Sequence, residues 1–308
     1  MNAPMNVLNL QPASLVKLVR ARPLLGTLVE IAATGADAQQ VQLALASAYR
    51  AVEQIHVLMS YQDADSDVSR INRDAYNSPI EIDPHTYRVL RAAQLMAQAS
   101  NGVFDITVAP TLNWLGYLPR HANSPRASAG ANWKDIRLLP DNRVRLDNSL
   151  RIDLSGIAKG YAVDVAIKAL REAGMFAGRV NAGGDLRVFG EGEQSIMVRN
   201  PAAHTQTIPL LALTEGAAAT SAGYYSSRRH QVRVITPIIN PLTRTACDSG
   251  RSVTVLARDC MTADALTKVV YANPGAALPV LKYYNARALI VENNPLTHAL
   301  HIFDSSQN

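Results

Sequence analysis

The sequence predicts a domain of the α+β class, and three observations lead to that prediction. The chain has 308 residues, enough for one large hydrophobic core or two of ordinary size. Apolar residues make up 48% of it and charged residues 18%, as in globular proteins rather than disordered ones. The expected strands and helices also follow one another without the regular βαβ order of a doubly wound sheet, which favours α+β.

Charge and cysteine usage argue against several classes of function. The formal net charge is +5 and the pI is near 9.3, yet the basic residues are scattered, and their densest group is 228–233. Only 6% of residues are aromatic, so we do not expect nucleic-acid binding. Cys247 and Cys260 stand in unlike contexts without a CxxC spacing, which predicts neither a zinc site nor a disulfide framework.

No segment has the pattern of a membrane span or a signal peptide. No stretch approaches the roughly 18 continuous apolar residues that cross a bilayer. The first residues lack the continuous apolar core of a signal peptide. We therefore expect a loose leader at 1–20 and a single domain at 21–308. The expected location is cytoplasmic, or periplasmic if a leader has been removed.

The elements of the N-terminal half are predicted from apolar spacing and capping residues. Asp83-Pro84 has the N-cap and N1 residues that open a helix, and β-branched residues indicate a strand near the N-terminus. The elements expected here are a strand at 24–33, helices at 37–59 and 83–100, and strands at 136–139 and 143–146.

Asp63, Asp65 and Asp67 alternate between the two helices, as they would in a calcium-binding loop. An EF-hand also needs a glycine at its sixth position and a glutamate at its twelfth, and both are missing. The sequence therefore does not predict a calcium site of that kind.

The stretch 151–185 contains the strongest functional pattern. A short apolar strand ending at Asp153 leads through a small-residue turn into an amphipathic helix at 158–173, and a glycine-rich turn follows the next strand. A strand–turn–helix unit aims free N–H groups and the positive end of the helix dipole at its turn. Lys159 adds a positive charge there, which indicates a phosphate site. A tight connection with a surface lysine is the alternative.

The C-terminal part is predicted to contain further strands and two helices. Residues 217–221 are expected to lead into a second small-residue turn. The other elements expected are strands at 186–189, 195–198, 208–213, 252–257 and 288–292, with helices at 261–271 and 275–284.

Six segments, in order, resemble the ApbE family, the FAD:protein FMN transferases, and they cover roughly residues 22 to 292. The segments are LLGTLVEI (24–31), MSYQDADSDVSRIN (59–72), GVFDITVAP (102–110), DLSGIAKGYAVD followed by NAGGD (153–185), ATSAGYY (219–225) and ADALT (263–267). The resemblance implies a fold of the T-fold kind, with antiparallel sheets covered by helices and a flavin site between two lobes.

The resemblance also implies an activity and a site. The activity is transfer of FMN from FAD to a Ser or Thr hydroxyl of a partner protein, with release of AMP and with Mg²⁺ as the metal. Motif matching gives catalytic roles to Asp264, Lys159 and Asp185. Asp264, expected as an exposed carboxylate, would bind the metal with Gly156 and Thr267. The residues assigned to the flavin nucleotide are Met59, Ser60, Tyr61, Phe104, Asp105, Thr107, Asp153, Ser155, Gly156, Lys159, Asn181, Gly183, Gly184, Asp185, Thr220 and Ser221.

One departure from the family pattern concerns the metal ligands. The family's threonine stands four residues after the aspartate, whereas here Thr267 is third and Lys268 is fourth. Both positions share a helix face with Asp264. Thr267 can reach the ion by a small rotation, or Lys268 can neutralise Asp264 directly.

Further departures concern two other motifs. Pro237, Asn240 and Arg244 stand where the family has a histidine, an aspartate and a glycine. An amide or a proline cannot act as a base. Ala222 also stands where a glycine is usual.

The leading interpretation is a metal-dependent FAD:protein FMN transferase. The first alternative is an FAD pyrophosphatase, which hydrolyses FAD to FMN and AMP. The second is an FAD-binding or carrier protein that has lost catalysis. The third is an α+β domain for another nucleotide, although the GxGxxG pattern of dinucleotide-binding folds is absent.

Overall fold

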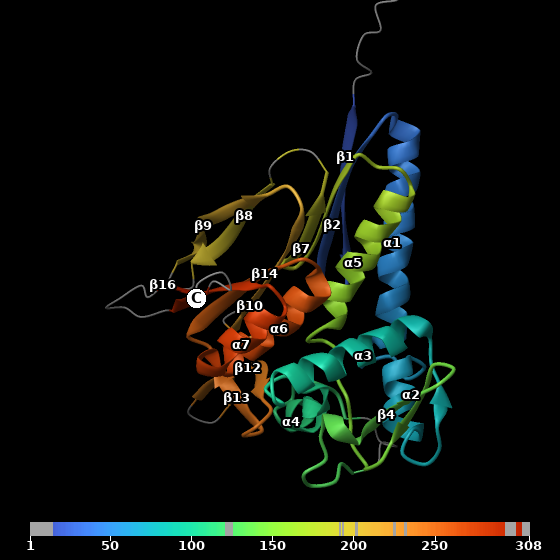
Figure 1. The fold of residues 1–308 in the computed structure, drawn as a ribbon, viewed down its shortest axis with the longest axis vertical. Coiled ribbons are helices and arrows are strands. Elements are labelled where there is room, and N and C mark those ends of the chain that lie inside the picture. The colour runs from blue at the N-terminus through green and yellow to red at the C-terminus, as the bar shows by residue number, and fades with distance from the viewer. Residues whose placement is uncertain are drawn as a thin grey trace, which may run out of the picture.

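A large antiparallel sheet covered by helices forms most of the protein, and a smaller, mainly helical part lies at one end of it (Figure 1). The computed structural model describes residues 15–120, 126–190, 192, 194–200, 203–223, 226–230, 233–292 and 300–303. Tyr224 and Tyr225, which end one of the family-like segments, lie outside the described residues. Within the described part, no helix is long and apolar enough to cross a membrane.

The main sheet has eight strands, and every neighbouring pair in it is antiparallel. This arrangement confirms the predicted α+β class. In spatial order the strands are β1 (Val16–Leu24), β2 (Thr27–Gly35), β6 (Ala177–Ala182), β7 (Asp185–Phe189), β10 (Gly216–Ala222), β14 (Arg251–Ala257), β15 (Arg287–Glu292) and β16 (Leu300–Phe303).

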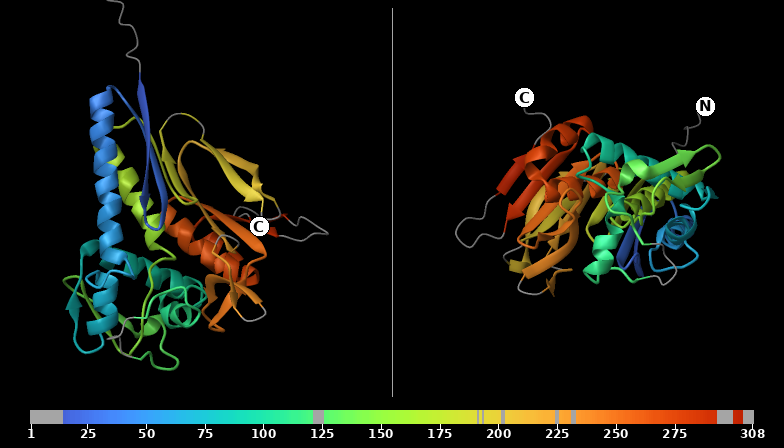
Figure 2. Two further views of the ribbon diagram at one scale, coloured as in Figure 1. Left: turned by 180° about the vertical axis from the view of Figure 1, so that it is seen from behind. Right: turned by 90° about the horizontal axis from the view of Figure 1, so that it is seen from below.

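Three helices cover this sheet: α1 (Ala38–Met59), α5 (Ala158–Glu172) and α6 (Cys260–Ala272). Each packs on a neighbouring pair of strands: α1 on β1 and β2, α5 on β6 and β7, and α6 on β10 and β14. Seen from behind, the β1–β2 hairpin runs alongside α1 (Figure 2). The apolar faces predicted for the helices form the core because they meet the buried face of the sheet.

The smaller part and the remaining elements extend this framework. Asp83 caps α3 (Pro84–Ala99) by accepting the N–H of His85 at 2.7 Å, as its Asp-Pro pattern predicted. The other helices are α2 (Asp67–Asp74), α4 (Ala109–Trp114) and α7 (Ala277–Tyr283), with 3₁₀ helices at Ile106–Val108, Trp133–Asp135 and Pro274–Ala276. One small sheet consists of β3 (Ile80–Glu81), β5 (Arg143–Leu146) and β4 (Ile136–Leu139), and another of β11 (Arg228–His230), β12 (Arg233–Asn240) and β13 (Thr245–Asp248). Strands β8 (Gln194–Asn200) and β9 (Ala203–Leu213) form a separate hairpin.

The N-terminal strand differs from the prediction. Residues 16–20, expected within a loose leader, form the first half of β1 and pair with β2 along its length. Most side chains of β1 are exposed, so the strand has no buried alternation to reveal it. The single strand expected at 24–33 is interrupted by a two-residue hairpin turn at Leu25 and Gly26, whose φ angles are +55° and +70°.

Two further segments differ from the elements expected for them. Residues 151–153 are not a strand, because Ile152 exchanges backbone hydrogen bonds with the side chain of Asn72 instead of a sheet neighbour. Residues 217–221, expected to lead into a turn, lie within β10 in the middle of the sheet. Their small side chains fit there because α6 packs closely on this strand.

Candidate functional site

A single cavity collects residues that are far apart in the sequence. Its volume is about 1000 Å³, at the top of the range of roughly 300–1,000 Å³ for small-molecule sites. Its walls come from the β1–β2 turn, the segment 103–106, the start of α5, the β6–β7 turn and the end of β10. The space between these elements is therefore large enough for a ligand of dinucleotide size.

The β6–β7 turn presents bare backbone to this cavity. Gly183 and Gly184 have φ angles of +61° and +100°, which non-glycine residues rarely adopt. The side chain of Asn181 holds the turn by accepting the N–H of Gly184 at 3.0 Å. A Cβ on Gly183 would overlap the hydroxyl of Thr27, so two turns approach each other closely here.

The turn before α5 is held by hydrogen bonds to the buried side chain of Asp153. Asp153 accepts the N–H of Ser155 at 3.1 Å and its hydroxyl at 2.5 Å. The N–H of Asp153 donates to the carbonyl of Ile106 at 2.8 Å, which ties this turn to another wall of the cavity. Burial raises the pKa of Asp153 above its ordinary value, and the two hydrogen bonds from Ser155 oppose that rise.

Lys159 and Asp185 form an ion pair between α5 and β7. The carboxylate is 1% exposed, whereas the lysine side chain is 27% exposed and lines the cavity. Burial raises the pKa of Asp185 to about 6, a rise that Asp264 adds to and that Lys159 and Lys268 oppose. Burial alone would lower the pKa of Lys159, but the neighbouring carboxylates raise it above its ordinary value. Among the described residues, Oδ1 of Asp185 has no hydrogen-bond partner.

Asp264 is completely buried, not exposed as the sequence led us to expect. Its Oδ1 pairs with the ammonium of Lys268, and its Oδ2 accepts the N–H of Gly160 at 3.0 Å. Burial by itself would raise the pKa of Asp264, but Lys268 and Lys159 hold it below its ordinary value. Of the two alternatives left open by the sequence, direct neutralisation by Lys268 is the one observed.

Thr267 is buried and turned toward its own helix. Its hydroxyl donates to the carbonyl oxygen of Asp264 at 2.6 Å and makes a second hydrogen bond with the hydroxyl of Ser221 at 2.7 Å. Thr220 makes a similar hydroxyl contact with Thr254, at 2.9 Å, on the neighbouring strand. These contacts fasten the end of β10 to its neighbours α6 and β14.

The cavity brings together most of the residues that the sequence assigned to the site. Those that line it are Phe104, Asp105, Asp153, Ser155, Gly156, Lys159, Asn181, Gly183, Gly184, Thr220 and Ser221. Asp185, Asp264, Thr267 and Thr107 do not line it but contact residues that do.

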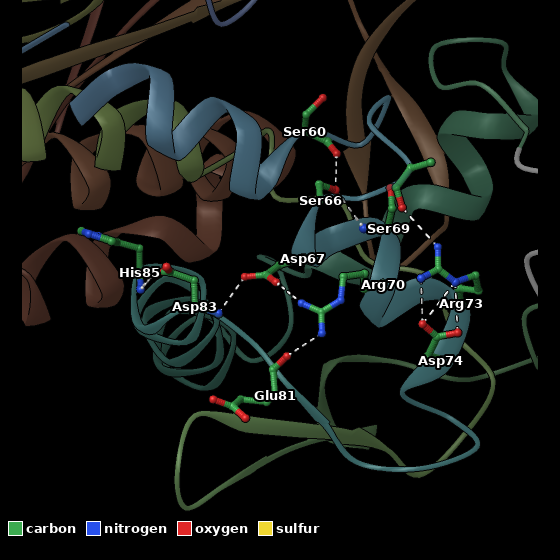
Figure 3. Close-up of polar contacts among 11 residues, drawn as sticks. Ser60, Ser66, Asp67, Ser69, Arg70, Arg73, Asp74, Glu81, Asp83 and His85 are labelled. Carbon is green, nitrogen blue, oxygen red and sulfur yellow. Dashed lines mark hydrogen bonds and ion pairs between the residues drawn. The ribbon is translucent and has the colours of Figure 1, made fainter. Parts of the chain in front are cut away.

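Met59, Ser60 and Tyr61 lie outside the cavity lining. The hydroxyl of Tyr61 is buried and donates to Oδ1 of Asn113 at 3.1 Å. The carbonyl of Ser60 accepts the hydroxyl of Ser66 at 2.6 Å, which also caps α2 (Figure 3). This segment therefore joins α1 to the smaller part of the protein.

The acidic loop beyond it is also internally satisfied. Asp67 is buried and pairs with Arg70 at 2.8 Å (Figure 3). Its second oxygen accepts the N–H of Asp83 at 2.8 Å, which links the start of α2 to the start of α3. Asp63 accepts the N–H of Asp65 at 3.0 Å. The alternating aspartates thus shape the loop, and Asp67 ties it to the start of α3.

Several lining residues were not identified from the sequence. Glu30 and Arg179 form an ion pair across the neighbouring strands β2 and β6, and Thr27 and Ile238 contribute other parts of the wall. The ion pair depends on strand register, which no local pattern reveals. For the contact between Thr27 and Gly183, the sequence indicated only the glycine and not its partner.

Two of the residues that depart from the family pattern have clear structural roles. Oδ1 of Asn240 accepts the N–H of Leu242 at 3.0 Å and of Thr243 at 3.4 Å, so an amide oxygen holds this turn. Arg244 has a φ of +55°, consistent with a glycine at this position. Its guanidinium donates to the carbonyls of Thr107 at 2.8 Å and Ala131 at 3.0 Å. These bonds attach the turn at Arg244 to the 105–107 segment.

Pro237 lines the cavity but has no titratable group. Gly223, one place after Ala222, has no room for a side chain, because a Cβ there would lie 2.5 Å from a methyl carbon of Thr236 and 2.6 Å from the hydroxyl oxygen of Tyr271. The need for a glycine in this motif is therefore met at 223.

Comparison with known proteins gives consistent matches. A model of the ApbE family matches residues 25–290. The chain is 30% identical to the FAD:protein FMN transferase of Vibrio cholerae over 234 residues, covering 70% of this chain and 69% of the relative. It is 24% identical to that of Treponema pallidum over an alignment of 315 positions, covering 92% of this chain and 84% of the relative.

Two solved structures have the same overall fold. The ApbE protein of Thermotoga maritima matches with a TM-score of 0.81 and 28% identity, covering 93% of this chain and 96% of that one. The flavin transferase ApbE of Vibrio cholerae matches with a TM-score of 0.78 and 26% identity, covering 96% and 98%.

Proposed function

This chain belongs to the ApbE family, and on that premise we propose that it is an FAD:protein FMN transferase. It moves FMN from FAD to a Ser or Thr hydroxyl of a partner protein and releases AMP. The hydroxyl oxygen forms a new bond to the FMN phosphorus, and the bond from that phosphorus to the bridging oxygen breaks. AMP leaves with the bridging oxygen, and the proton of the hydroxyl passes to solvent.

One observation carries this proposal: the side chains of Lys159 and Lys268 line the same cavity as the Gly183–Gly184 turn. Phosphoryl transfer depends mainly on positioning and on neutralising charge on the transferred group. Two ammonium groups and bare backbone meet that need at a pyrophosphate. Phe104 and Ile238 give an apolar wall for a ring system.

Magnesium does not fit the residues present beside Asp264. Both carboxylate oxygens already have partners, and the hydroxyl of Thr267 is engaged by the carbonyl of Asp264 and by Ser221. Mg²⁺ needs a near-octahedral shell of oxygen ligands at about 2.0–2.1 Å. No step of the proposed transfer is therefore assigned to a metal at this position.

Two alternative activities use the same site. Water in place of the acceptor hydroxyl gives FAD pyrophosphatase activity, and FAD held without reaction gives a carrier. Pro237 lines the cavity but has no side-chain group that could take a proton from the acceptor hydroxyl. Without a base at this position transfer to the acceptor is expected to be slow, and the experiment therefore has to distinguish all three activities.

Incubation with FAD and an acceptor protein carrying a Ser/Thr flavinylation motif separates the three activities. For the transferase we expect covalent flavin fluorescence on the acceptor in a denaturing gel, with an added mass of FMN less one water. AMP release without labelling would support hydrolysis. Saturable binding of unchanged FAD would support the carrier.

A further inference from the structure

Lys268 occupies the space beside the carboxylate that the family pattern gives to a metal ion. It lies one turn after Asp264 on α6, and its ammonium pairs with that carboxylate. Its methylene groups cross the turn at Gly156, where a Cβ would lie 3.6 Å from Cε of Lys268. The side chain remains 22% exposed and lines the cavity, so the ammonium lies between Asp264 and any ligand there.

Two lysines line this wall of the cavity, and three buried carboxylates lie beside or behind them. Asp153, Asp185 and Asp264 are at most 6% exposed, whereas Lys159 and Lys268 are 27% and 22% exposed. Both lysines therefore face the cavity, as does Asp153, whereas Asp185 and Asp264 lie behind the lysines. An anionic ligand in the cavity meets two positive charges whose counter-ions are already in place.

An ammonium and a divalent ion supply different chemistry at this position. The ammonium of Lys268 can donate three hydrogen bonds to anionic oxygens, but it accepts no lone pair and carries no water ligands. It is also covalently held, so its occupancy does not depend on the concentration of an ion in solution.

We propose that Lys268 is a built-in substitute for a divalent cation: its ammonium bridges the Asp264 carboxylate and the FAD pyrophosphate, so FAD binds without a metal ion at this position. The inference rests on the proposed function for the identity of the ligand. It does not depend on FMN transfer, because it concerns only how the anion is held.

A titration with Mn²⁺ alone tests whether Lys268 excludes a divalent ion. We expect no saturable Mn²⁺ binding by the wild-type protein, as followed by the electron paramagnetic resonance signal of free Mn²⁺. Lys268→Thr should gain one site, and adding Asp264→Asn should remove it. Lys282→Thr is the matched control on the exposed face of α7. Mn²⁺ binding by the wild type, or none by Lys268→Thr, would overturn the proposal.

FAD binding in EDTA and in MgCl₂ tests the second half of the inference. The wild-type affinity, measured by flavin fluorescence quenching, should agree within about twofold in the two buffers. Lys268→Thr should bind at least about tenfold more weakly in EDTA and recover with Mg²⁺, whereas Lys268→Arg should remain metal-independent. Loss of wild-type FAD binding in EDTA would refute the inference, whether or not the variants fold.

The outcomes also separate this inference from the proposed function. EDTA-insensitive FAD binding without labelling of an acceptor would contradict the transferase but support the role of Lys268. Labelling that requires Mg²⁺, with FAD binding lost in EDTA, would support the transferase and refute the built-in cation.

Discussion

The backbone N–H of Gly160 donates to Oδ2 of Asp264 at 3.0 Å, so a carboxylate on α6 caps the first turn of α5. Ile157, the N-cap residue of α5, makes no side-chain capping bond of its own. The same carboxylate pairs with Lys268 through its other oxygen. Asp264 therefore joins the start of α5 to the middle of α6, and its role is structural as well as electrostatic.

Asp264→Ala should destabilise the protein by about 3–5 kcal/mol, because it leaves a partly buried ammonium and a helix N–H without their acceptor. Asp264→Asn keeps an oxygen for Gly160 and should lose roughly 1–2 kcal/mol less. Urea unfolding measures both. Asp65→Ala, in an exposed loop, is the control and should stay within about 0.5 kcal/mol of wild type. A stable Asp264→Ala variant would mean that the carboxylate is not needed for the fold.

Gly160→Ala should disturb the contact between α5 and α6. A Cβ at this position would overlap the carbonyl of Cys260 and lie 2.8 Å from Cβ of Asp264. The Cys260 carbonyl belongs to the backbone of α6, so relieving the overlap requires the helix itself to shift. We expect a loss of at least about 1–3 kcal/mol in the free energy of unfolding. Gly250→Ala is the matched control, since its Cβ would meet nothing within 4 Å. Equal stability of the two variants would contradict the close packing.

The fold was predictable where local chemistry decides it. Asp37 and Asp83 are the N-caps at which α1 and α3 begin, and an apolar face follows each of them. Both helices are found where they were predicted. Strand β1 was missed because an exposed edge strand needs only backbone pairing.

The candidate site was predictable as a set of motifs but not as a set of contacts. The spacing of Asp264 and Lys268 places them on one helix face, which allowed their pairing to be anticipated. The burial of Asp264 depends on α5 meeting α6 at Gly160, more than a hundred residues earlier in the chain. Tyr61 was assigned to the pocket, yet its hydroxyl bonds to Asn113 in the core, a contact that no local pattern specifies.

Lys159→Met should weaken FAD binding by about tenfold or more, because it removes one of two ammonium groups at the cavity and leaves Asp185 uncompensated. Lys159→Arg should restore most of the affinity. Lys134→Met, on an exposed residue outside the cavity, controls for the change in net charge. Flavin fluorescence titration gives the dissociation constants, and unchanged affinity in Lys159→Met would remove this lysine from the phosphate site.

Arg244→Ala and Arg244→Gly separate the guanidinium contacts from backbone strain. Both variants lose the bonds to the carbonyls of Thr107 and Ala131. Only alanine keeps a side chain at a φ of +55°. Arg244→Gly should therefore be more stable than Arg244→Ala by roughly 0.4–1 kcal/mol in thermal or urea unfolding. The reverse order would show that the turn relaxes away from positive φ.

FAD affinity should rise as the pH falls through about 6, because Asp185 takes up a proton there. Burial raises the pKa of this carboxyl from 3.8 to about 6, Asp264 adds to the rise, and Lys159 and Lys268 oppose it.

The folded protein thus holds the Asp185 proton more tightly than the unfolded chain does. The contribution of Asp185 to stability is present at low pH and is lost as the pH rises from about 4 through 6.

The same proton changes the charge that a ligand meets. Above pH 6 the Asp185 carboxylate offsets the ammonium of Lys159, whereas below it the neutral acid leaves that positive charge free for an anion. Between pH 7.5 and 5 we expect FAD to bind about three- to tenfold more tightly, measured by fluorescence titration at constant ionic strength. Asp185→Asn should bind with the low-pH affinity at every pH in this range, and Asp65→Asn should follow the wild type. A flat wild-type profile, or weaker binding in acid, would show that the Asp185 proton is not linked to the ligand.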